Sequence, residues 1–197
     1  EDLLAGAPFG ALIDVSDQDS NDTMTLALVD GNSAGFFALN ASSRQLEMAK
    51  SGLDFESPAL AQFPLSVRAT DAMGQSSICK LLAVVQDVNE PPFLWNFSAS
   101  ITETTAFTPH VAGESVGDAL VASDPDGDTL TYQLIDHEPA NTTSYFELDS
   151  ATGQLRLTAA GAAGLDFEGL SQSYRMHVRV LDAGSPQLSA SAEVVVS

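Results

Sequence analysis

Two copies of one sequence module follow each other along this chain, and the repetition limits the folds that its 197 residues can adopt. Asp17-Gln18-Asp19 returns as Asp124-Pro125-Asp126, 107 residues later. Leu53-Asp54-Phe55-Glu56 returns as Leu165-Asp166-Phe167-Glu168, 112 residues later. A period of about 110 residues is the length of a domain and not of a solenoid repeat. We therefore predict two domains, residues 1–88 and 89–197, each with its own core.

Alternating apolar and polar residues predict that both domains are all β. Apolar side chains occupy every second position in residues 63–69 and 174–180, which is the period of a half-buried strand. Turn signals such as Asp126-Gly127-Asp128 separate these segments. Short strands with frequent turns favour an antiparallel β-sandwich in each domain. Residues 159–164 (Ala-Ala-Gly-Ala-Ala-Gly) could form a turn of helix, but their glycines favour a loop.

The charge of the chain excludes several classes of partner. Asp and Glu number 27 against 7 Lys and Arg, so the net charge is −20. Such a chain repels nucleic acid and anionic lipid and attracts cations. The longest apolar run, Leu81–Val85, is far too short to insert into a membrane. With 44% hydrophobic residues, the chain is also expected to fold rather than to be an acidic disordered segment.

Glycosylation sequons indicate an extracellular or cell-surface location. Four N-x-Ser/Thr sequons are present, at Asn21, Asn40, Asn96 and Asn141. Cys79 is the sole cysteine, so no intrachain disulfide is possible. Its setting favours a small buried strand residue over an intermolecular bridge or a reactive thiol. Because both ends fall within a module or at its joint, we expect an ectodomain fragment of a longer protein.

An acidic joint lies between the two copies, at Asp87-Val88-Asn89-Glu90-Pro91-Pro92. Acidic motifs lie on both sides of it, among them Asp54-Phe55-Glu56 and Asp124-Pro125-Asp126. Carboxylates that gather at a joint between β domains are suited to a hard cation, and calcium prefers such oxygen ligands. For any single Asp in these motifs, an ordinary turn or surface residue is the favoured interpretation, but the whole set favours a metal site.

The order and spacing of these motifs resemble two tandem repeats of the cadherin family. The joint matches the family's linker, Leu53-Asp54-Phe55-Glu56 and its second copy match the LDRE motif, and Asp124-Pro125-Asp126 matches the DxD motif. Asp71 and Asp182 match the aspartate that closes a strand in each repeat. The resemblance implies two tandem seven-stranded Greek-key β-sandwiches joined by a calcium-binding linker.

The resemblance also implies a ligand set for about three calcium ions at the joint. Val88 and Pro91 would contribute main-chain oxygens and the other residues their side chains. Eight of the side chains are acids, which would repel one another unless cations were bound. The implied ligands are Glu1, Asp54, Glu56, Asp87, Val88, Asn89, Glu90, Pro91, Asp124, Asp126 and Asp182.

The implied function is a calcium-rigidified extracellular adhesion or spacer module of a larger cadherin-like protein. Its partners would be neighbouring repeats of the same chain and other cadherin-like or surface proteins. A purely structural module of an extracellular filament or matrix assembly is the competing interpretation. Asp54 and Glu56 could also be the acid pair of a carbohydrate-active enzyme. That alternative is disfavoured because the pair recurs as Asp166 and Glu168, so we predict no enzyme and no catalytic residue.

Overall fold

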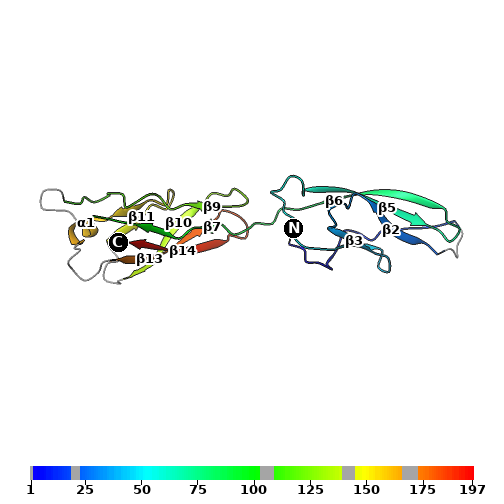
Figure 1. Ribbon diagram of the computed structural model, residues 1–197, viewed down its shortest axis with the longest axis horizontal. Helices are drawn as coiled ribbons and strands as arrows, with labels where there is room; N and C mark the ends of the chain where they lie inside the picture. Colours follow the sequence, from blue (N-terminus) through cyan, green and yellow to red (C-terminus); the bar gives the residue numbers. More distant parts are fainter. Residues whose placement is uncertain (1, 19–22, 103–108, 139–144, 166–172) are drawn as a thin grey trace. The chain divides into compact units, whose positions relative to one another are not determined.

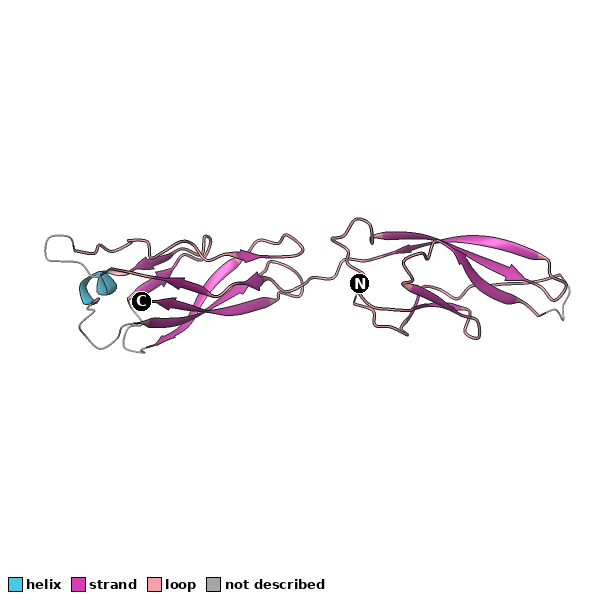
Figure 2. Cartoon of the chain, in the orientation of Figure 1, coloured by secondary structure: helices cyan, strands magenta, loops and turns pink. Residues whose placement is uncertain are grey.

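The computed structural model describes residues 2–18, 23–102, 109–138, 145–165 and 173–197. The chain divides into two compact units, Glu1–Val88 and Asn89–Ser197. Nearly all regular structure in both units is β-strand (Figure 2), so the all-β prediction is confirmed.

The second unit is a two-layered β-sandwich (Figure 1). One sheet has the order β10-β13-β14-β8, and the pairs β11–β12 and β7–β9 complete the unit. β7 and β8 are consecutive pieces of one first strand, so the unit has the seven strands of the predicted sandwich. β10 pairs with β13 and not with its successor in the chain, as a Greek-key connection requires. The elements are β7 (Phe93–Leu94), β8 (Phe97–Ala99), β9 (Ala122–Ser123), β10 (Thr131–Glu138), β11 (Phe146–Leu148), β12 (Leu155–Leu157), α1 (Ala159–Gly164), β13 (Tyr174–Leu181) and β14 (Ser189–Val196).

The central strand β13 supplies much of this unit's core. Its side chains alternate between buried and exposed, as the sequence period predicts. Met176, Val178 and Val180 are fully buried, and they join Leu155 and Leu157 of β12 in one hydrophobic cluster. Because both layers contribute to the cluster, burial of its apolar side chains holds the sandwich together.

The larger sheet of the first unit repeats the order of the first three strands in the larger sheet of the second unit. The sheets of the first unit have the orders β2-β5-β6 and β1-β4-β3. β5 alternates as predicted, and Phe63, Leu65 and Val67 are buried. The rings of Phe37 and Phe63 meet edge to face, with centroids 4.9 Å apart, in the core of this unit. The elements are β1 (Pro8–Phe9), β2 (Thr25–Asp30), β3 (Phe37–Asn40), β4 (Gln45–Met48), β5 (Gln62–Thr70) and β6 (Ser76–Val84).

Residues 159–164 form the short helix α1, so the prediction of a loop is wrong. The Thr158 side chain caps the helix by accepting a hydrogen bond from the Gly161 N–H. A Cβ atom at Gly161 would lie 2.1 Å from the carbonyl oxygen of Tyr145. The glycines therefore permit close packing of the helix, which outweighs their low helix propensity. Among the described residues, no helix is long and apolar enough to cross a membrane.

Cys79 is exposed, so the prediction of a buried cysteine is also wrong. It lies opposite buried Val67 in the β5–β6 ladder, on the face of β6 that points inward. The described residues place no further strand beside β6, so this inward position remains accessible to solvent.

Two neighbouring positions on β13 test how far the core controls stability. We expect Met176→Ala to destabilise the second unit by about 2–5 kcal/mol, because it leaves a cavity in a fully packed core. His177→Ala, on the exposed face of the same strand, should change stability by about 0.5 kcal/mol or less. Denaturant unfolding followed by circular dichroism measures both. Equal effects of the two substitutions would contradict the observed strand orientation.

Candidate metal centre

Acidic side chains of the second unit lie in loops at the ends of its strands. Asp124 and Asp126 follow β9, and Asp182 follows β13. The loop after β9 is a tight turn, because the Gly127 N–H donates to the Asp124 carbonyl oxygen over 3.2 Å. The Asp128 N–H donates to Oδ1 of Asp124 over 3.1 Å. These bonds fix the first carboxylate against its own loop.

Asp182 is a buried carboxylate, with 1% of its surface exposed. Its Oδ1 accepts hydrogen bonds from the Leu188 N–H over 2.8 Å and the Gly184 N–H over 3.3 Å. Burial acts to raise the pKa of Asp182, but these bonds and one from Asn89 outweigh it and hold the pKa below its ordinary value. The side chain therefore remains an anion at neutral pH.

The start of the linker is attached to both acidic loops of the second unit. Nδ2 of Asn89 donates to Oδ2 of Asp182 and to the carbonyl oxygen of Pro186, each over 3.0 Å. The next residue, Glu90, donates its backbone N–H to Oδ2 of Asp126 over 2.8 Å. The linker is thus positioned by the same side chains that the sequence predicted as metal ligands.

Gly184 makes room for the Asn89 side chain. A Cβ atom at this position would lie 1.7 Å from Oδ1 of Asn89. The backbone of Gly184 is outside the left-handed region, so any amino acid could adopt its conformation. The requirement for glycine therefore comes from contact with Asn89 and not from backbone strain.

Two carboxylate oxygens in the second unit are buried and accept no hydrogen bond within the described part of the chain, Oδ2 of Asp124 and Oδ1 of Asp126. A buried carboxylate oxygen without a partner is costly, because it has lost its hydration and gained nothing in return. Both residues already use their other oxygen in a hydrogen bond. Hard oxygen donors held in this way suit a calcium ion, which takes 6–8 oxygen ligands.

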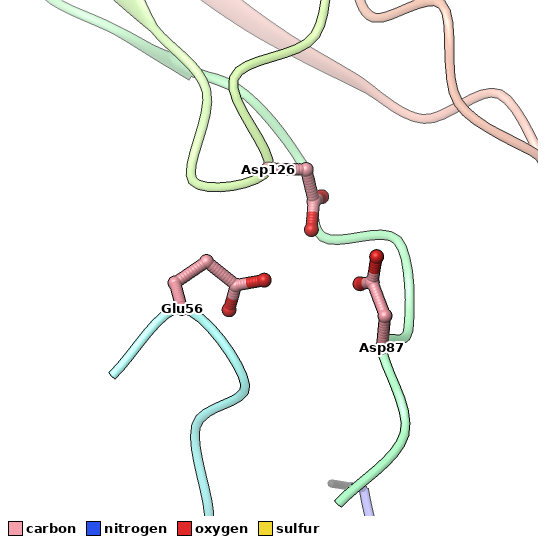
Figure 3. Close-up of side chains that lie close together, drawn as sticks. All are labelled: Glu56, Asp87 and Asp126. Atoms are coloured by element: carbon pink, nitrogen blue, oxygen red, sulfur yellow. The ribbon is translucent and has the colours of Figure 1, made fainter. Parts of the chain in front are cut away.

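The first unit brings a second group of acids together. Carboxylate oxygens of Glu56 and Asp87 lie within 4.8 Å of each other (Figure 3). Asp54 is exposed, and its Oδ1 accepts a hydrogen bond from the Ser57 N–H over 3.1 Å. Like charges at such a distance repel, and a bound cation would remove the repulsion. The third carboxylate drawn in Figure 3, that of Asp126, belongs to the second unit.

The ligand set inferred from sequence remains a prediction. Eight of the predicted side-chain ligands belong to residues that fall into the two groups just described or lie beside them. Val88 and Pro91 lie in the linker, with Pro91 exposed. Sequence reasoning did not identify Gly184 or the Pro186 carbonyl as linker contacts. Several residues named from sequence lie outside the described residues: Glu1, Asp19, Asn21, Asn141, Asp166 and Glu168.

Comparison with known proteins identifies the class of these domains. No protein-family model matches the chain. Rat Protocadherin Fat 2 is 32% identical over 199 residues, a match that covers 93% of this chain and 4% of the relative. Human Protocadherin Fat 1 is 28% identical and covers 96% of this chain, again with 4% of the relative. The chain thus spans a small fraction of the length of these relatives.

Comparison with solved structures agrees with the comparison of sequences. The first two extracellular repeats of human Protocadherin-24 superpose with a TM-score of 0.69 and 24% identity, covering 100% of this chain and 91% of that one. Both units therefore have the β-sandwich fold of the repeats in that structure. The chain belongs to the cadherin family, as its motifs predicted.

A two-substitution cycle tests the contact between linker and loop. We expect Gly184→Ala to displace the Asn89 side chain and to lose one or both of its hydrogen bonds, at about 0.5–1.5 kcal/mol each. In an Asn89→Ala background the same substitution should cost little, because nothing is left to displace. Thermal unfolding in the presence of a chelator measures all four proteins. Additive effects would show that Gly184 acts independently of Asn89.

Proposed function

We propose that this chain is a calcium-rigidified extracellular adhesion or spacer module of a larger cadherin-like protein. The observation that carries the proposal is the pair of buried carboxylate oxygens, on Asp124 and Asp126, that accept no hydrogen bond from the described residues. Calcium coordinated by these oxygens would satisfy both of them. The net charge of −20 supports the same conclusion, since bound cations would neutralise part of it.

Calcium would act mainly on the joint between the repeats. Each repeat has its own hydrophobic cluster and so has the means to fold without metal. The linker from Gln86 to Pro92 is short and polar, and its prolines restrict the backbone without fixing an orientation. Ions that share ligands from Glu56 and Asp87 of one repeat and Asp126 of the next would supply the missing constraint.

The partners we propose are neighbouring cadherin repeats and other cadherin-like surface proteins. This follows from the relatives, which are protocadherins many times longer than this chain. A rigid series of repeats would hold distant binding surfaces at a fixed spacing, whereas a flexible series would have to lose conformational freedom on binding. We infer an extracellular location on the same basis.

Calcium should stabilise the chain against heat. A ligand that binds only the native state at one hundred times its Kd adds about 2.7 kcal/mol. Asp126→Asn should lose about 1.4 kcal/mol of this effect for every tenfold loss of affinity. Glu147→Gln, an exposed acid on β11, should respond like the wild type. Melting curves with calcium and with chelator provide the test. Equal melting temperatures in the two conditions would contradict the calcium proposal.

Removing a ligand from either repeat should loosen the joint and leave the sandwiches intact. We expect Asp87→Ala and Asp126→Ala each to lower calcium affinity and to widen the distribution of inter-repeat angles. Strand content should remain unchanged, because neither residue belongs to a hydrophobic cluster. Small-angle scattering in calcium reports the angles, and circular dichroism reports the strands, with Glu147→Ala as control. A variant that kept wild-type stiffness, or lost its strands, would contradict this mechanism.

A further inference from the structure

The first strand of the second repeat changes sheets partway along its length. Its first piece, β7, pairs with β9, and its second piece, β8, pairs with β14. Asn96 lies at this crossover, after the end of β7 at Leu94 and before the start of β8 at Phe97. Oδ1 of Asn96 accepts a hydrogen bond from the Glu193 N–H of β14 over 3.2 Å. A side chain thus satisfies a backbone donor at the point where the strand changes sheets.

Large apolar side chains are exposed next to this crossover. Phe93, Trp95 and Val121 are all exposed, and we call these three residues the crossover surface. The rings of Phe93 and Trp95 meet edge to face, with centroids 4.4 Å apart. The register of β7 and β9 pairs Phe93 with Ser123, and its continuation sets Trp95 opposite Val121. Residues opposite each other in a ladder have side chains on the same face, so the three belong to one surface.

The segment that carries the crossover surface has no charged residue of its own. Asp, Glu, Lys and Arg are absent from residues 91–102, although the chain has 27 acids and 7 bases. β8 is also the last strand of its sheet, and the described residues pair it only with β14. A free edge beside exposed apolar side chains is open to pairing with another chain, and natural β-proteins protect such edges, most often with charged side chains. Here the protection must come from something else.

A glycosylation sequon lies in this uncharged segment. Asn96-Phe97-Ser98 has the pattern N-x-Ser/Thr, and both Asn96 and Ser98 are exposed. An N-linked glycan is attached to the side-chain nitrogen of asparagine, Nδ2. The hydrogen bond from Glu193 uses the other atom of the amide, Oδ1. A glycan on Nδ2 is therefore compatible with the contact that positions Asn96 in the fold.

The other sequon in the described part of the chain, at Asn40, has a different setting. Asn40 is half-buried, and its Nδ2 donates to Oε1 of Glu47 over 2.6 Å. Its Oδ1 accepts hydrogen bonds from the Ser42 and Ser43 N–H groups over 3.0 and 3.1 Å. A glycan on Asn40 would have to share Nδ2 with the contact to Glu47. Asn96 is thus presented to solvent in a way that Asn40 is not.

We propose that Asn96 carries an N-linked glycan, which covers the crossover surface. The donor is a lipid-linked oligosaccharide diphosphate. A bond forms between Nδ2 of Asn96 and C1 of the first sugar, and the bond from C1 to the diphosphate oxygen breaks. The lipid diphosphate leaves with the electron pair of that bond, and Nδ2 releases one of its two protons to solvent. The amide keeps its second proton, and Oδ1 keeps its hydrogen bond from Glu193.

A glycan provides what this segment lacks. It is bulky and solubilising, so it surrounds its attachment point with hydrated hydroxyl groups. Those groups would stand in front of Trp95 and the free edge of β8, where no charged side chain does so. This inference rests on the proposed extracellular location, because the transfer takes place in the secretory pathway, but it does not depend on calcium.

The occupancy of each sequon is the first test. The 197-residue chain is secreted from cultured animal cells and treated with peptide N-glycosidase in heavy-oxygen water, which converts each glycosylated Asn to a labelled Asp. Peptide mass spectrometry should find the label at position 96 in most molecules. Ser98→Ala, which leaves Asn96 itself in place, should lose the label, and Ser98→Thr should retain it. An unlabelled position 96 in the secreted wild type would overturn the proposal.

Trp95 is the sole tryptophan, so its fluorescence reports on coverage of the crossover surface. The Ser98→Ala chain should lose protection from quenching by acrylamide, whereas Ser98→Thr should be as protected as the wild type. Ser42→Ala removes the sequon at Asn40 and should leave quenching unchanged. Trimming the wild-type glycan to its first sugar with an endoglycosidase should reproduce the loss without any substitution. Equal quenching of the intact and trimmed wild-type proteins would overturn the covering role.

Melting curves of the same secreted proteins separate this inference from the proposed function. Ser98→Ala should keep the full stabilisation by calcium, because Ser98 lies outside the acidic loops. A wild-type chain that calcium stabilises but that carries no glycan at Asn96 would overturn this inference and leave the calcium proposal intact. A glycan at Asn96 on a chain that calcium does not stabilise would support this inference and contradict only the calcium proposal.

Discussion

Burial of carboxylates is the constraint on which the second repeat's loops and the linker depend, because each buried carboxylate oxygen needs a partner that replaces its lost hydration. Asp182 is almost fully buried, and it remains an anion only because N–H groups of its own loop and of Asn89 surround it. Asp126 attaches Glu90 to the same repeat through a second hydrogen bond. The acids thus have two roles, since they position the linker and also present unpartnered oxygens to a cation. A substitution that removes one of these carboxylates removes both roles, so its effect on the linker should exceed that of a lost surface charge.

The fold could be predicted from sequence wherever a simple period governs burial. Residues 63–69 and 174–180 alternate because each strand has one face on a core, and the structure confirms both. The helix at residues 159–164 was not predicted, because it packs through a close contact between Gly161 and Tyr145. No local sequence pattern relates these two positions. The sequence also did not identify the contact between Gly184 and Asn89, which lie 95 positions apart. Such contacts depend on how loops meet in space, which periodicity and propensity do not specify.

The error at Cys79 has a different physical origin. The sequence pattern correctly placed this residue on a strand, and the ladder places it on the inward face, opposite Val67. What fails is the assumption that an inward position is covered, since burial requires a neighbouring strand as well as an orientation. Ala192, in the same position of the second repeat, is buried in a sheet that β8 completes. Burial of a strand residue therefore depends on its neighbours in the sheet as well as on its own orientation.

The two features of the first repeat act at different places and through different forces. The groove beside β6 is lined mostly by apolar side chains, and burial of hydrocarbon is a force that salt does not screen strongly. The acids at Glu56 and Asp87 respond to cations. The acids and the groove are nevertheless connected through the chain. Asp87 follows β6 by three residues and lines the end of the groove. The position of Asp87 therefore depends on how β6 packs as well as on the charges around it.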